Sequence, residues 1–137
     1  MKKILVPIDG SDYSMRALER AKELGEFYKA EITLLTVVDS GRFISIDFKQ
    51  DMINLGIEAG QELLLKATNL LEGYPYGLKS TYRMGDIANE IITMAEENDF
   101  DIIVIGSRGL GTFKRALLGG VSQKVVSHAD TTVMVVK

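Results

Sequence analysis

The chain has 137 residues, of which 46% are hydrophobic and 26% are charged, with a formal net charge of -3. These values predict a single globular domain over residues 1–137 and exclude a fibrous or disordered chain. No apolar run approaches the ~18 residues that a membrane-spanning helix needs, and the absence of cysteine excludes disulfides and thiolate metal sites. We therefore expect a cytoplasmic protein with no membrane partner.

The predicted elements alternate between strands and helices along the whole chain. Apolar runs predict strands at residues 2–8, 31–39, 101–106 and 131–137, and the alternating, more polar stretch at 78–84 predicts an edge strand. Periodic apolar residues predict helices that start at a cap formed by Ser11 or Asp12, and then at about 50–72, 87–97 and 119–129. Residues 40–49 show no pattern and are expected to form a loop. The alternation predicts an α/β domain, with an open parallel sheet and helices on both faces.

One segment combines glycines with positive charge. Residues 106–120 hold five of the 13 glycines, together with Arg108, Lys114 and Arg115. Residues 106–137 carry five basic side chains and one acidic side chain, whereas residues 1–105 carry 11 and 18. A positive patch on an acidic body suits a small anion and argues against a nucleic-acid partner. The alternatives are that the charges form a solvated face and that the glycines only permit turns.

The position of this segment favours a phosphate site. In an open parallel sheet, ligands bind beyond the carboxyl ends of the strands, where the strand order reverses. Gly106 and Gly109 follow the fourth predicted strand and let backbone amides approach a ligand. Gly119 and Gly120 start the last helix, whose first amides and dipole attract an anion, and Ser122 adds a hydroxyl. The spacing matches neither a Walker loop nor the dinucleotide fingerprint.

Residues for catalysis are few. His128 is the only histidine, and it is expected to be an ordinary residue near the end of the last helix. Asp9 follows the first buried strand, which is a suitable place for a functional carboxylate, whereas helix capping explains Asp12 equally well. We expect no efficient chemistry. A slow ATPase or phosphotransferase that uses Asp9, a divalent ion and Ser122 remains an alternative.

With these features the chain resembles the universal stress protein family, whose nucleotide-binding members carry G-x2-G-x9-G-(S/T). Gly106, Gly109 and Gly119 have this spacing, and "KKILVPIDGSDYSMRAL" and "GDIANEII" resemble the opening and the third-helix entry of the family. The resemblance implies a flavodoxin-like (Rossmann-like) sheet of five parallel strands in the order 3-2-1-4-5. It also implies a homodimer that pairs through residues 131–137, for which an apolar edge strand gives independent support.

The resemblance further implies binding of ATP or AMP, with Mg²⁺ or Mn²⁺ carried by the phosphates. Three residues would line the adenosine pocket: Pro7, Asp9 and Val37. Two would face the ribose and the first phosphates: Gly106 and Gly109. Four would hold the phosphates through backbone amides and one hydroxyl: Gly119, Gly120, Val121 and Ser122. Arg108 would screen the phosphates, which is an inference from its charge.

The chain departs from the family pattern at Gly120, where the family has serine or threonine. The sequence therefore leaves several functions open. We expect a stress-response regulator or sensor that works through nucleotide-linked conformation and dimerisation. The alternative is a family member that has lost the motif, binds no nucleotide and acts as a dimeric interaction module. In either case, the 107–118 loop is expected to be mobile without a ligand.

Overall fold

The computed structural model describes residues 1–40, 46–110 and 118–137. The strands are β1 (Lys3–Pro7), β2 (Glu31–Val38), β3 (Leu78–Met84), β4 (Ile102–Gly106) and β5 (Thr132–Val136). The helices are α1 (Asp12–Tyr28), α2 (Ile46–Leu70), α3 (Ile87–Glu97) and α4 (Gly120–His128). Each predicted element is present. Residues 46–49 were expected in a loop but belong to α2, and most of the loop that we expect to be mobile (111–117) lies outside the described residues.

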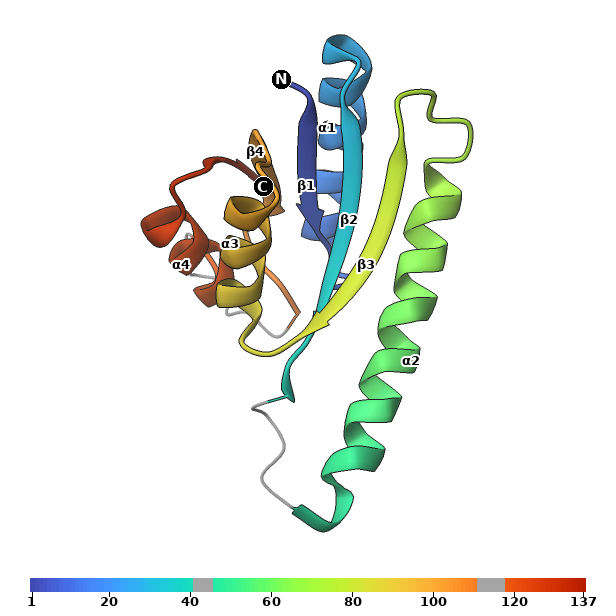
Figure 1. Cartoon of the computed structure of the whole chain (residues 1–137), viewed down its shortest axis with the longest axis vertical. Coiled ribbons are helices and arrows are strands. Elements are labelled where there is room, and N and C mark those ends of the chain that lie inside the picture. The colour runs from blue at the N-terminus through green and yellow to red at the C-terminus, as the bar shows by residue number, and fades with distance from the viewer. Residues whose placement is uncertain (41–45, 111–117) are drawn as a thin grey trace.

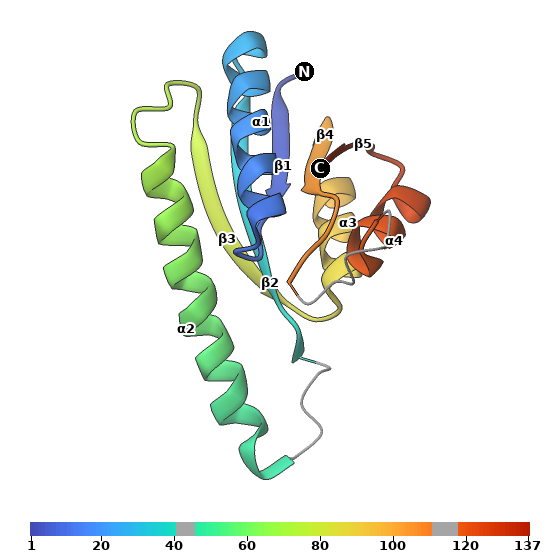
Figure 2. The same ribbon diagram turned by 180° about the vertical axis from the view of Figure 1, so that it is seen from behind.

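The strands form one parallel sheet in the order β3-β2-β1-β4-β5, as the family resemblance implied. Helices α1 and α2 pack on one face of the sheet, and α3 and α4 pack on the other (Figure 1 and Figure 2). The central strands are buried on both faces, which explains why their sequences are continuous apolar runs. In the part of the chain that is described, no helix has the length and apolarity to cross a membrane.

A proline ends the pairing between β1 and β4. The Ile8 amide donates to the Leu35 carbonyl of β2 at 2.8 Å. Because successive residues of a strand direct their amides to opposite sides, Pro7 faces β4, where its missing N–H cannot donate. The β1–β4 register accordingly reaches Leu5 and Ile103 and continues no further, whereas β1 pairs with β2 as far as Pro7. A crevice can therefore open between the carboxyl ends of the two strands, where the strand order reverses.

Gly25 lies inside α1, where glycine costs about 1 kcal/mol relative to alanine. The structure gives the reason. A Cβ on Gly25 would lie 2.1 Å from the Tyr74 hydroxyl and 3.2 Å from Cδ1 of Ile32. The Tyr74 hydroxyl donates to the Ala30 carbonyl, and burial raises the pKa of this phenol. The missing side chain of Gly25 thus lets the tyrosine cross the end of the helix.

Asp86 joins the two helices on the second face. Its carboxylate accepts a hydrogen bond from the Asn89 amide at 3.1 Å, which caps α3, and from Nζ of Lys124 on α4 at 3.1 Å. These two partners, the Asn89 amide first, hold the pKa of Asp86 below its ordinary value of 3.8. The carboxylate therefore stabilises the fold above pH 3.8 and loses this contribution as the pH falls through its lower folded-state pKa.

We predict that Asp86→Asn removes part of this pH dependence. Asparagine caps a helix about as well as aspartate, so the substitution removes mainly the exposed ion pair, which is worth about 0.2–1 kcal/mol. At pH 7 the variant should be less stable by that amount, and the difference should vanish as the pH falls well below 3.8. Urea unfolding of both proteins, from pH 7 to well below pH 3.8, measures this difference in the free energy of unfolding. A difference that grows as the pH falls would contradict the assignment.

Candidate functional site

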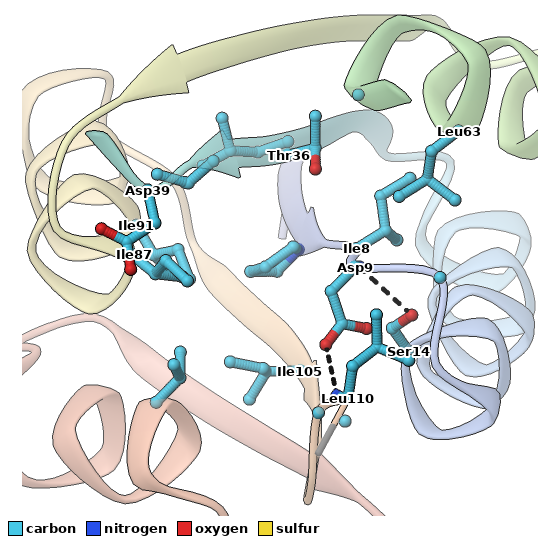
Figure 3. A pocket seen from close by; sticks show the side chains of 18 of the residues that line it. Ile8, Asp9, Ser14, Thr36, Asp39, Leu63, Ile87, Ile91, Ile105 and Leu110 are labelled. Carbon is cyan, nitrogen blue, oxygen red and sulfur yellow. Dashed lines mark hydrogen bonds between the residues drawn. The ribbon is translucent and has the colours of Figure 1, made fainter. Parts of the chain in front are cut away.

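The predicted site residues come together in one cavity of about 750 Å³ beside the carboxyl ends of the central strands (Figure 3). All ten line it: Pro7, Asp9, Val37, Gly106, Arg108, Gly109, Gly119, Gly120, Val121 and Ser122. They come from the carboxyl ends of β1, β2 and β4, from the segments that follow β1 and β4, and from the start of α4. The crevice that Pro7 opens between β1 and β4 is therefore the place where these segments meet.

A wall that the sequence did not predict comes from α2. Gly56, Ala59, Gly60 and Leu63 line the cavity, and Figure 1 shows the first turns of α2 running past the carboxyl ends of the strands. A Cβ on Gly56 would lie 2.8 Å from Cγ1 of Val38, and one on Gly60 would lie 3.1 Å from a Thr36 methyl. The missing side chains bring α2 against β2. Small residues four apart in a long helix were the available signal for this close approach.

The start of α4 forms the polar end of the cavity. In α1 and α3 a side chain caps the helix, since Ser11 accepts from the Ser14 amide and Asp86 accepts from the Asn89 amide. The cap residue of α4 is Gly119, which has no side chain to do this. The next three amides, at residues 120–122, have no hydrogen-bond acceptor among the described residues. Three free amides at a positive dipole end can bind an anion.

Gly120 and Ser122, both in the first turn of α4, differ in exposure and in hydrogen bonding. Gly120 is exposed, and a Cβ there would have no atom within 4 Å. Ser122 is only 2% exposed. Its hydroxyl was expected to donate to a phosphate, but Oγ lies 2.7 Å from the Ser107 carbonyl and 3.1 Å from the Gly119 carbonyl. Its single hydrogen is used within the protein, so residues 120–122 offer their backbone amides to a ligand.

Asp9 stands at the mouth of the cavity with both carboxylate oxygens bonded. Oδ1 accepts from the Ser11 amide at 2.9 Å, and Oδ2 accepts from the Leu110 amide at 3.2 Å. Figure 3 shows the second of these bonds joining the β1 loop to the β4 loop. A Cβ on Gly109 would lie 2.6 Å from Oδ2 of Asp9, so the absence of a side chain lets the two loops meet.

Charged groups lie at both ends of the cavity. Arg108 lines the cavity, and its guanidinium carbon is 5.8 Å from the centre of the Tyr13 ring, within reach of a cation–π contact. Asp39 lies at the opposite end from Asp9, beside Ile87 and Ile91 of α3 (Figure 3). Among the described residues, no three acidic, histidine or cysteine side chains gather as they would around a metal ion.

The whole chain, residues 1–137, matches the model of the universal stress protein family. A universal stress protein of Methanocaldococcus jannaschii is 35% identical over 139 aligned positions, which cover 99% of this chain and 82% of that protein. The fold is also shared with the universal stress protein UspA from Lactobacillus plantarum. That structure superposes with a TM-score of 0.92 at 23% identity and covers 99% of this chain and 97% of its own.

Two similar solved structures hold a nucleotide. One is a universal stress protein family protein from Arabidopsis thaliana with AMP bound, at 26% identity and a TM-score of 0.74, covering 100% of this chain and 92% of that one. The other is a universal stress protein in complex with cAMP, at 25% identity and a TM-score of 0.76, covering 99% of this chain and 97% of that one.

Proposed function

The chain belongs to the universal stress protein family, and we propose that it binds an adenine nucleotide, ATP or AMP, in the cavity between β1 and β4. The single observation that carries this proposal is the start of α4, which no side chain caps and whose amides at residues 120–122 have no acceptor among the described residues. Residues 120–122 line the same cavity as the other predicted site residues. The nucleotides present in two similar structures support the choice of adenine.

The shape of the cavity suggests how the nucleotide lies. The phosphates would contact the amides of α4 and Arg108, because both are positive and both line the cavity. The base would lie towards Val37 and the glycine wall of α2, where the lining is apolar. Asp9 also lines the cavity, where a carboxylate can accept hydrogen bonds from ribose hydroxyls. This arrangement keeps the roles inferred from the sequence except that of the Ser122 hydroxyl, which is bonded within the protein.

We propose that the protein acts by binding and signalling and catalyses no efficient reaction. A general base beside the phosphates is needed for hydrolysis, and the oxygens of Asp9 already accept from two backbone amides. The described side chains offer no ready-made metal cage. Mg²⁺ or Mn²⁺ would therefore be held by the phosphate oxygens and water, because these hard ions prefer oxygen ligands. The family supports a stress-response role, and we propose that the protein performs it in the cytoplasm.

The proposal is tested by placing a negative charge in the phosphate end. Gly120→Asp should fold, since its Cβ has open space and aspartate is favourable in the first turn of a helix. We expect the affinity for AMP to fall at least tenfold, on the order of the 1.5–3 kcal/mol of a hydrogen bond to a charged group. The affinity for adenosine should change little. Isothermal titration of protein stripped of co-purified nucleotide measures both.

Gly120→Asn is the matched control, because it adds the same volume without the charge. An equal loss of AMP affinity in the two variants would mean that the volume of the new side chain lowers the affinity, and that repulsion between its charge and a phosphate does not. If the unsubstituted protein binds neither AMP nor ATP nor adenosine, the nucleotide proposal fails.

The second candidate is a dimeric interaction module without a nucleotide, and two observations favour it. Gly120 replaces the hydroxyl residue of the family motif. In addition, β5 is an edge strand whose outer residue Met134 is 36% exposed. We propose that residues 131–137 pair with a second copy of the chain, as exposed apolar edges tend to do. Sedimentation at several concentrations tests this, and a dimer that binds no nucleotide would support the second candidate over the first.

A further inference from the structure

The Ser122 hydroxyl is a buried group that the proposed binding scheme leaves without a role. It lies in the first turn of α4 and is 2% exposed. Its Oγ is within hydrogen-bond distance of two protein carbonyls, 2.7 Å from that of Ser107 and 3.1 Å from that of Gly119. A serine hydroxyl has one hydrogen to donate. The shorter distance assigns that hydrogen to Ser107, so a ligand phosphate would have to compete with a carbonyl already in place.

The acceptor of this bond is itself firmly held. Ser107 is 2% exposed and directly follows β4. Its amide donates to the Val136 carbonyl of β5 at 2.7 Å, and its carbonyl accepts a second bond from the Gly119 amide, also at 2.7 Å. The Ser107 carbonyl therefore binds both the cap residue and the first turn of α4. Through this one peptide, the start of the helix is fixed to the ends of two strands.

The free amides of α4 depend on this fixation. Residues 120–122 take part in no cap because Gly119 has no side chain. A helix end without a cap frays readily, since its first turn is held by few bonds. Besides the hydrogen bonds within the helix itself, the described bonds that hold it include the Gln123 amide to the Gly119 carbonyl and the two bonds to the Ser107 carbonyl. The Ser122 hydroxyl supplies the one of these that comes from a side chain.

We infer that Ser122 is a positioning residue: its hydroxyl, bonded to the Ser107 carbonyl, keeps the first turn of α4 in the geometry in which three amides converge on one phosphate. The inference rests on the proposed nucleotide function. It assigns Ser122 an action on the protein, in place of direct donation to the ligand. Ser122 should therefore increase the affinity for ligands that carry a phosphate and leave the affinity for adenosine unchanged. Its effect on the first turn of α4 should be measurable in the protein without a ligand.

Three substitutions separate these roles. Ser122→Ala removes the hydroxyl, Ser122→Cys keeps the size with a much weaker donor, and Ser122→Thr keeps the hydroxyl. Loss of one neutral hydrogen bond predicts about a fivefold effect. In Ser122→Ala and Ser122→Cys, the affinity for AMP should therefore fall about fivefold. The affinity for adenosine, which has no phosphate, should not change. Ser122→Thr should restore the ratio of the two affinities.

The second measurement is amide hydrogen exchange in the nucleotide-free proteins. We expect exchange at the Gly119 and Gln123 amides to speed up about fivefold in Ser122→Ala and Ser122→Cys. Amides in the middle of α1 serve as the control and should not change. Both results together support the inference.

Each other outcome overturns it in a recognisable way. A lower AMP affinity with unchanged exchange would make Ser122 a direct phosphate ligand. Faster exchange with an unchanged ratio of AMP to adenosine affinity would make its role purely structural. No change in either would remove the role altogether. If the unsubstituted protein binds no AMP, the proposed function itself fails, which is distinct because it is seen before any substitution is made.

Discussion

Replacing Gly106 by alanine should lower the free energy of unfolding by about 1–3 kcal/mol, the usual range for overpacking a core. Gly106 is the last residue of β4 and is buried. A Cβ there would lie 2.7 Å from the Tyr13 carbonyl carbon and 2.9 Å from the Ser14 amide nitrogen. Both are backbone atoms at the start of α1 and cannot move aside as a flexible side chain could. The helix must therefore shift away from the sheet, and the cavity must change with it.

Urea unfolding measures the loss of stability, and titration with AMP measures how much affinity is lost when the cavity changes. Gly120→Ala is the matched control, because the same methyl group enters open space. It should leave stability unchanged to within about 0.5 kcal/mol, as is common for surface substitutions. If Gly106→Ala proves as stable as the control, then α1 does not approach β4 as closely as the structure has it.

Gly120→Ser should increase the affinity for AMP about tenfold or more, since a hydrogen bond to a charged group is worth about 1.5–3 kcal/mol. Gly120 is the first residue of α4, and a Cβ there would meet no atom of the described residues within 4 Å. The new hydroxyl can therefore donate to a phosphate at the helix start without strain in the protein. The substitution also restores the residue type that the family motif has at this position.

Titration of Gly120→Ser, Gly120→Ala and the unsubstituted protein with AMP and with adenosine separates the contributions. The gain should appear for AMP only and should be absent in Gly120→Ala. A gain that is equal for adenosine would show that residue 120 contacts the nucleoside. Binding in Gly120→Ser alone would mean that the natural chain has lost its ligand, in favour of the dimeric interaction module.

The fold could be predicted from the sequence because its signals are local. Four of the strands are apolar runs and β3 alternates in polarity, and the first three helices have apolar residues at a repeat of about 3.6. The two helices with polar caps begin within one residue of the predicted positions, at Asp12 and Ile87. The start of α2 was placed four residues late. Residues 46–49 are helical in the structure, yet no capping residue and no clear periodicity marks this start in the sequence.

The candidate site could be predicted only in part, and the missing part depends on contacts between distant segments. Glycines after β4 are visible as a motif, and all ten expected residues line the cavity. The wall formed by α2 was not predicted, because it depends on how closely Gly56 and Gly60 approach β2. The hydroxyl of Ser122 was assigned to a phosphate for the same reason, since only the structure shows the Ser107 carbonyl beside it.

The short β1–β4 ladder also has a consequence for the order in which the molecule is made. It pairs Ile4 with Ile102 and Leu5 with Ile103, so its partners are separated by most of the chain. Closing such a long loop is slow and depends on contacts that form late. During synthesis, the helix that carries the free amides follows later still. A ribosome-bound chain therefore lacks the cavity between β1 and β4 until nearly all of it has emerged, and formation of this cavity comes at the end of folding.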